Sequence, residues 1–206
     1  MSPLLTSTAY FPPAHWFILA GQCGAWYTEA HENYQKGGWR NRCRIAGPNG
    51  EQLLSVPLEK GKHQKKPIQD VRISYRQEWW REHEQAIRTA YGRSPFFEFY
   101  AEDLFAVVRS QPTTLWALNQ GLTETVLRLL HWDIPRQDTE TFTSAVAPDL
   151  HRVPQTGACL MPYPQVFTDR HGFLPGLSVL DALFCLGPQL LTSQIAPQNP
   201  PPDNPA

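Results

Sequence analysis

The chain has 206 residues and a formal net charge of −1, which argues against a protein built to coat nucleic acid or an anionic membrane. Hydrophobic residues make up 41% of it, enough for one sizeable core and too many for disorder over the whole length. No apolar run approaches the ~18 residues of a transmembrane helix, and Met1–Tyr10 lacks the basic residues of a signal peptide. We therefore expect a soluble, cytoplasmic protein.

The first half of the chain predicts short strands around one helix. A proline pair, Pro12-Pro13, precedes the predicted helix Ala14–Gly24. Asn49-Gly50 separates two strand-like runs, which is a strong hairpin signal. Alternation of side chains or β-forming composition predicts the strands Leu4–Ala9, Trp26–Glu29, Arg42–Ala46, Gln52–Leu58 and Ile68–Ser74.

The middle of the chain predicts helices. From Glu78 to Tyr91 the apolar residues recur at steps of three and four, which indicates one buried helix face. Ser94-Pro95 is typical of a helix start, and we expect a helix from there to Val108. Further helices are predicted after a Thr113-Thr114 cap as far as His131, and within Leu177–Phe184.

Strands first and helices in the middle predict an α/β (mixed α+β) single domain. We expect an N-terminal strand-rich sheet, including the hairpin, packed by the central helices. This domain is expected over residues 1–194. Residues 195–206 are rich in proline and predict a disordered tail. The four cysteines form no C-x-x-C pair, so neither a structural zinc site nor a disulfide framework is expected.

A local excess of positive charge is the strongest candidate for chemistry. Between Lys36 and Lys66 there are eight lysines and arginines against two glutamates. On a strand, Arg40, Arg42 and Arg44 would project from one face, where guanidinium groups suit phosphate or carboxylate. Three alternatives stay open: a face paired with Glu and Asp of a neighbouring helix, a phosphate-bearing small molecule, and, as a distant third, nucleic acid. The predicted substrate-binding residues are Tyr34, Lys36, Arg40, Asn41, Arg42 and Arg44.

Two histidines and a glutamate are the candidate catalytic groups: His31, Glu32 and His83. On a strand, Glu29 would share a face with His31 and orient its imidazole for acid/base work. A carboxylate and an imidazole are too few ligands for a catalytic zinc site, so no metal is expected. His83 lies on the apolar helix face, either as a neutral core histidine or as a general base in an aromatic pocket. A satisfied structural histidine is the alternative for His31 as well.

Eight stretches, in order along the chain, carry a family resemblance. They are T-A-Y-F-P-P at 8–13, H-E-N-Y-Q-K-G-G-W-R-N-R-C-R-I at 31–45, P-N-G at 48–50, L-S-V-P at 54–57, W-x-x-x-H at 79–83, A-Y-G-R-S-P-F-F at 90–97, Y-P-Q-V-F at 163–167 and F-L-P-G-L-S-V-L-D-A-L-F at 173–184. Together they resemble the WbqC-like protein family of bacterial surface-polysaccharide loci. The chain departs from the family at Gly37-Gly38, where a polar pair is more usual, and at Cys185, where Asn is common.

The resemblance implies a role in making or decorating a cell-surface glycan. We expect a cytoplasmic transferase or ligase acting on a sugar or a nucleotide-activated precursor, such as a nucleotide sugar. The alternative is a non-catalytic accessory protein that binds an anionic ligand or partner through the basic face of residues 36–66. In either case the blocks around His31 and His83 are expected to meet in one concave site. The sequence names no cofactor and leaves the oligomeric state open.

Overall fold

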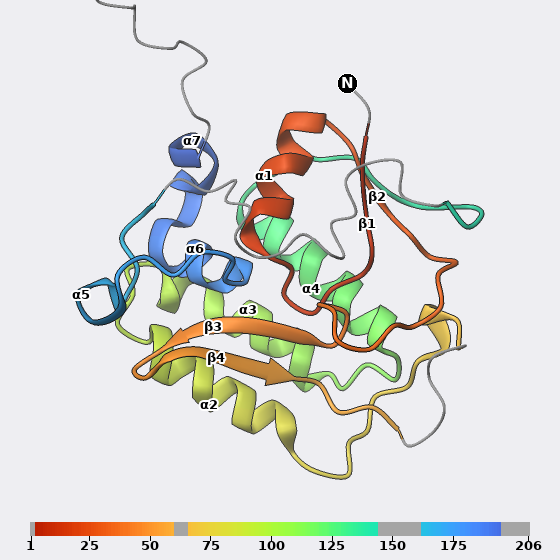
Figure 1. Ribbon diagram of the computed structural model, residues 1–206, viewed down its shortest axis with the longest axis horizontal. Helices are drawn as coiled ribbons and strands as arrows, with labels where there is room; N and C mark the ends of the chain where they lie inside the picture. The colour runs from red at the N-terminus through yellow and green to blue at the C-terminus, as the bar shows by residue number, and fades with distance from the viewer. Residues whose placement is uncertain (1–2, 60–65, 144–161, 195–206) are drawn as a thin grey trace, which may run out of the picture.

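The computed structural model describes residues 3–59, 66–143 and 162–194 and confirms the mixed α/β class (Figure 1). A small parallel sheet has the strand order β1-β2-β5, formed by Leu4–Thr6, Trp26–Thr28 and Arg136–Asp138. Helix α1, Ala14–Cys23, connects β1 to β2 as predicted. It ends at Gly24, whose φ of 74° gives the left-handed cap that glycine favours. The predicted tail and the lysines at 60, 62 and 65 lie outside the described residues.

The predicted hairpin is confirmed and forms a two-stranded sheet of its own. Strands β3, Arg42–Gly47, and β4, Gly50–Ser55, run antiparallel and pair from Arg42 opposite Ser55 to Gly47 opposite Gly50. The turn residue Gly50 has a φ of 106°, which a side chain would strain. The backbone N–H of Ala46 donates to Tyr91 Oη at 2.9 Å, which ties the inner side of the hairpin to the end of α2.

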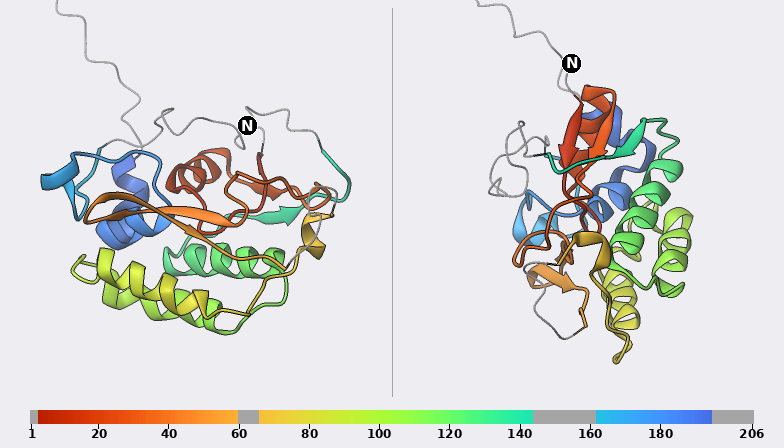
Figure 2. Two further views of the ribbon diagram at one scale, coloured as in Figure 1. Left: turned by 60° about the horizontal axis from the view of Figure 1, so that its bottom comes forward. Right: turned by 90° about the vertical axis from the view of Figure 1, so that its right-hand side faces the viewer.

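The remaining helices surround the two sheets. They are α2 Trp79–Tyr91, α3 Phe97–Arg109, α4 Leu115–Leu129, α5 Thr168–His171, α6 Val179–Leu186 and α7 Leu190–Gln194, with short 3-10 turns at Ile68–Asp70 and Gly187–Gln189. Figure 2 shows α2, α3 and α4 together on one side of the molecule, with α1 on the opposite side. None of these helices, among the residues described, has the length and apolar character needed to span a bilayer.

Two sequence predictions about local structure are wrong. Ile68–Ser74 is a 3-10 turn followed by isolated bridges at Arg72 and Ile73, because each residue finds a different partner segment instead of one neighbouring strand. Ser94 does not cap α3, which begins at Phe97. Its hydroxyl donates to Tyr91 O at 2.6 Å, so it closes the end of α2 instead.

The predicted cap of α4 is confirmed at Thr114, whose Oγ1 accepts a hydrogen bond from Ala117 N at 3.2 Å. Thr114→Ala should lower the free energy of unfolding by about 1 kcal/mol, because it leaves an N–H at the helix start without its acceptor. Urea denaturation measures the loss. The neighbouring Thr113 is exposed and caps nothing, so Thr113→Ala is the matched control. Equal losses in the two variants would contradict the capping role.

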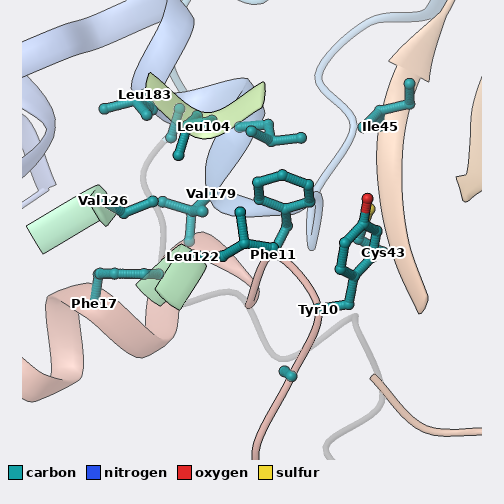
Figure 3. Packing of buried hydrophobic residues seen from close by; sticks show 14 of the residues in the cluster. Tyr10, Phe11, Phe17, Cys43, Ile45, Leu104, Leu122, Val126, Val179 and Leu183 are labelled. Atoms are coloured by element: carbon teal, nitrogen blue, oxygen red, sulfur yellow. The ribbon is translucent and has the colours of Figure 1, made fainter. Parts of the chain in front are cut away.

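One hydrophobic core connects the parallel sheet, the hairpin and the helices. The loop after β1 inserts Tyr10 and Phe11, both fully buried, between the hairpin and the helices. Figure 3 shows them beside residues of β3, α1, α3, α4 and α6: Cys43, Ile45, Phe17, Leu104, Leu122, Val126, Val179 and Leu183. This loop therefore sets how the parallel sheet lies relative to the hairpin.

Candidate functional site

The loop that leaves the carboxyl end of β2 carries most of the predicted site residues. In open parallel sheets, ligands bind outside the carboxyl ends of the strands. Here those ends lead into three neighbouring segments that begin at Ser7, Glu29 and Thr139. The middle one, residues 29–41, then runs into β3. Position alone therefore makes this segment, taken together with the first residue of β3, the leading candidate for a site. We refer to it as the residue 29–42 segment.

Glu29 joins two of these segments instead of orienting an imidazole. Its Oε1 accepts from the backbone N–H of His31 at 2.7 Å and from Thr139 Oγ1 at 3.0 Å, and its Oε2 accepts from Thr143 N at 2.8 Å. The contact predicted between Glu29 and the His31 ring is thus made through the His31 backbone. Glu29 is buried, whereas His31 is exposed.

Arg40 lies inside the protein and not on the face of the hairpin. Its Nε donates to Glu32 Oε1 at 2.9 Å, and its Nη2 makes a second short contact with Glu32 Oε2. Both side chains are 5% exposed or less. The prediction that Arg40 shares a face with Arg42 and Arg44 is wrong, because β3 begins only at Arg42 and Arg40 belongs to the turn before it.

Tyr34 and Asn41 also make internal contacts. Tyr34 Oη donates to Asn41 Oδ1 at 3.0 Å, and Asn41 Nδ2 donates to Val56 O at 2.9 Å. Burial raises the pKa of Tyr34, and the charges of Arg42 and Arg40 partly offset this. Both side chains therefore fasten the loop to the end of the hairpin, which leaves them little freedom to contact a substrate.

Arg42 and Arg44 share the outer face of β3, as predicted, but their surroundings differ. Arg44 Nη1 lies 2.7 Å from Glu51 Oε2, and its guanidinium lies 5.7 Å from the centre of the Trp39 ring. Arg42 is half-buried, and its Nε is buried with no hydrogen-bond acceptor. Lys36, earlier in the same loop, is exposed. Only Arg42 of the three arginines thus lacks a carboxylate partner among the described residues.

His83 is part of an aromatic cluster in the core. Its Nδ1 lies 2.9 Å from Tyr10 Oη, and its ring centre lies 5.0 Å from that of Trp79. Burial lowers the pKa of His83 to about 4, while a hydrogen bond with the backbone of Ser55 acts in the opposite direction. The imidazole is therefore neutral at pH 7 and has a structural contact. No described contact connects it with His31, so the shared site of the two histidines stays a prediction.

Two neighbours of this segment were not singled out from the sequence as site residues. Trp39 lies beside Arg44, and its place in the W-R-N-R run was the available signal. Asn119 donates from Nδ2 to Arg40 O at 2.8 Å across 79 residues of chain, and no local pattern could have indicated that contact. In the part of the chain that is described, no three His, Cys, Asp or Glu side chains are placed to hold a metal ion.

Comparison with known proteins gives one match. The profile of the WbqC-like protein family matches residues 8–158, which include the whole residue 29–42 segment, the hairpin and helices α1 to α4. No curated protein and no solved structure matches the chain.

Proposed function

Because the chain belongs to the WbqC-like protein family, we propose that it acts in bacterial surface-polysaccharide synthesis by binding a phosphate-bearing precursor. The ligand would lie at the outer side of the residue 29–42 segment. The protein would hold a nucleotide sugar, or a similar activated sugar, for the enzymes that use it. This is the accessory role that the sequence offered as the alternative to a transferase or ligase, restricted here to a smaller set of basic residues.

Arg42 carries this proposal. Arg40 is neutralised by Glu32 and Arg44 is paired with Glu51, so neither needs an external anion. Arg42 is half-buried, so it has lost part of its hydration, and it gains no carboxylate in return from the described part of the chain. A half-buried charge without a partner destabilises the fold unless an anion pairs with it. A phosphate at the outer side would pair with the guanidinium group of Arg42 through charge-assisted hydrogen bonds, and exposed Lys36 would add charge at the rim.

A transferase or ligase is the second candidate, and exposed His31 favours it. His31 is in the same segment as Arg42, with its imidazole in contact with solvent. A group in that position is able to exchange protons with a bound substrate. His83 is not a suitable base, because its neutral ring is buried and bonded to Tyr10. Glu32 is likewise engaged by Arg40. Catalysis would therefore depend on His31.

Arg42→Ala should weaken binding of UDP-glucose by roughly 1.5–3 kcal/mol, the usual range for a hydrogen bond to a charged group. Isothermal titration calorimetry measures this against the wild-type protein. Arg81→Ala is the control, since Arg81 is an exposed arginine of α2 paired with Glu78. Equal affinity in the Arg42→Ala and Arg81→Ala proteins would overturn the proposal. Turnover that His31→Ala abolishes without weakening binding would select the enzyme over the accessory protein.

A further inference from the structure

A separate cavity of about 660 Å³ lies between the α2–α3 connection, the segment that leads into α5, and α6. It is at the end of the molecule where α5 projects in Figure 1. Its walls include Gln165 and Phe167 from the segment that leads into α5, and Cys185 of α6. The volume falls within the range of cavities that hold small organic ligands.

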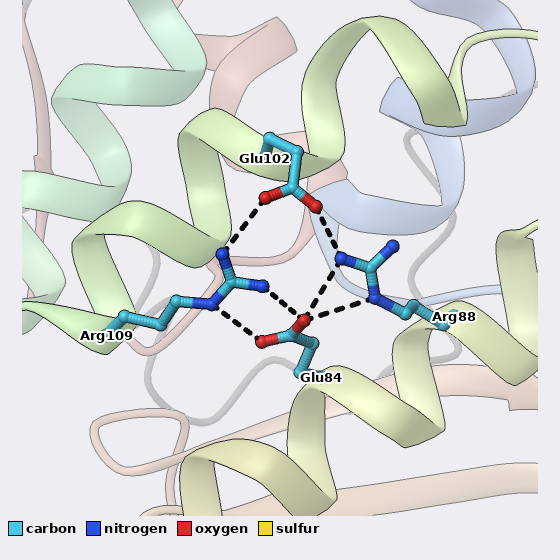
Figure 4. A network of polar contacts seen from close by, with 4 residues as sticks. All are labelled: Glu84, Arg88, Glu102 and Arg109. Carbon is cyan, nitrogen blue, oxygen red and sulfur yellow. Dashed lines mark hydrogen bonds and ion pairs between the residues drawn. The ribbon is translucent and has the colours of Figure 1, made fainter.

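The charged residues that line this cavity are all arginines: Arg88, Arg93 and Arg170. Arg88 is held by Glu84 and Glu102 in the network of Figure 4, through its Nε and Nη2 and not its Nη1. Arg93 and Arg170 are exposed, and neither has an ion pair among the described residues. Among the residues that the structure describes, no Asp or Glu lines the cavity, so Arg93 and Arg170 have no carboxylate partner there.

The walls of the cavity are fixed by hydrogen bonds that are buried or partly buried. Gln165 Nε2 donates to Asp181 Oδ2 at 2.8 Å and to Leu174 O at 3.0 Å, and its Oε1 accepts from Leu174 N at 2.8 Å. Asp181 is fully buried behind Gln165, so its carboxylate does not line the cavity. On the other side, Phe96 N donates to Phe184 O at 3.1 Å, which fastens the start of α3 to α6.

A close approach between α3 and α6 adds to this rigidity. A Cβ on Gly187 would lie only 2.6 Å from the ring of Phe96, so glycine is needed there for the ring to pack against the backbone. The cavity thus lies between elements that are joined directly to one another. Such a preformed cavity needs little rearrangement to accept a ligand.

We propose that this cavity is a second binding site, for a small organic anion that carries a ring. Arg93 and Arg170 contact a phosphate or carboxylate group, as guanidinium groups do in bidentate pairs. The ring packs against Phe167 and the neighbouring Pro95 and Pro164. Arg88 forms part of the wall, and its charge is balanced by its two glutamate partners. This site uses no residue of the Arg42 site and does not depend on it.

Glucose 6-phosphate, glucuronate and neutral glucose are the probes that test the site by calorimetry. The wild-type protein should bind one or both of the anions and not glucose. The Arg93→Ala/Arg170→Ala double variant should bind the anion at least about tenfold more weakly, as expected for lost charge-assisted hydrogen bonds. Phosphate and carboxylate sources are distinguished by whether glucose 6-phosphate or glucuronate binds more tightly.

Arg128→Ala is the matched control, because Arg128 is an exposed arginine of α4 paired with Asp103 away from the cavity. Arg42→Ala should also leave this binding unchanged, which separates the cavity from the site proposed above. NMR shifts of the backbone amides of Gln165, Arg170 and Cys185 locate the ligand. Binding of glucose as tight as that of the anions, no binding of either anion, unchanged affinity in the double variant, or shifts confined to other residues would each overturn the proposal.

Discussion

Glu32→Ala should lower the free energy of unfolding by about 3–5 kcal/mol, the usual cost of breaking a buried ion pair by removing one partner. The side chains of Glu32 and Arg40 are 5% and 3% exposed, so water cannot replace the lost carboxylate. The backbone of Arg40 is also fixed, because its carbonyl accepts a hydrogen bond from Asn119. The Arg40 side chain is therefore not free to turn toward solvent. Urea denaturation of the purified protein measures the effect.

Glu51→Ala is the control for this prediction. Its partner Arg44 lies at a similar distance, but these two side chains are 35% and 37% exposed, so the expected loss is about 0–1 kcal/mol. A Glu32→Leu/Arg40→Met protein should recover part of the loss, because it removes both charges together. Equal losses in Glu32→Ala and Glu51→Ala would show that burial does not determine the strength of the first pair.

Acidification from pH 7 to pH 4 should destabilise the wild-type protein by roughly 3 kcal/mol through His83 alone. Burial lowers the pKa of His83 to about 4, against an ordinary value of 6.5. Between these two values the unfolded chain binds a proton that the folded protein does not. Stability contributed by the neutral ring is therefore complete above pH 6.5 and is lost as the pH falls toward 4.

His83→Gln removes this titration, and denaturant unfolding at pH 7 and pH 4 measures it. The drop in free energy between the two pH values should be smaller in the variant by about the same 3 kcal/mol. Burial lowers the pKa of His15 to about 4 as well, so it adds a drop in the same direction. Because His15 is present in both proteins, its contribution cancels in the comparison. If the free energy of unfolding of His83→Gln depended on pH as that of the wild-type protein does, His83 would not be the group that titrates between pH 7 and pH 4.

Local signals predicted much of the fold. The hairpin turn, the glycine that ends α1 and the threonine that begins α4 each satisfy backbone groups within a few residues, so the sequence pattern suffices. Strand β5 was missed because Arg136–Asp138 is short, polar and paired only with a segment near the start of the chain. The alternation of side chains in Ile68–Ser74 wrongly predicted a strand, because this segment pairs with other segments only through isolated bridges.

The candidate site was predicted less completely, and the reason is again long-range contact. The composition of residues 31–44 identified the basic segment. Which arginine is left without a carboxylate partner, however, depends on the positions of Glu32 and Glu51 and on where β3 begins. Spacing places three arginines on one face of an ideal strand. The turn at Arg40 removes one of them. The cavity of Arg93 and Arg170 involves segments over 70 residues apart, and no pattern in either segment indicates the other.

The late position of β5 in the chain has a consequence for synthesis on the ribosome. Glu29 and Thr139, which meet at the carboxyl edge of the sheet, are 110 residues apart. Strands β1 and β2 can pair early through α1, but one edge of β2 stays open until β5 has emerged and the intervening helices have folded. An open strand edge is a template for pairing with other chains. Because β2 has only three residues, it offers a nascent neighbour very few hydrogen bonds during that interval.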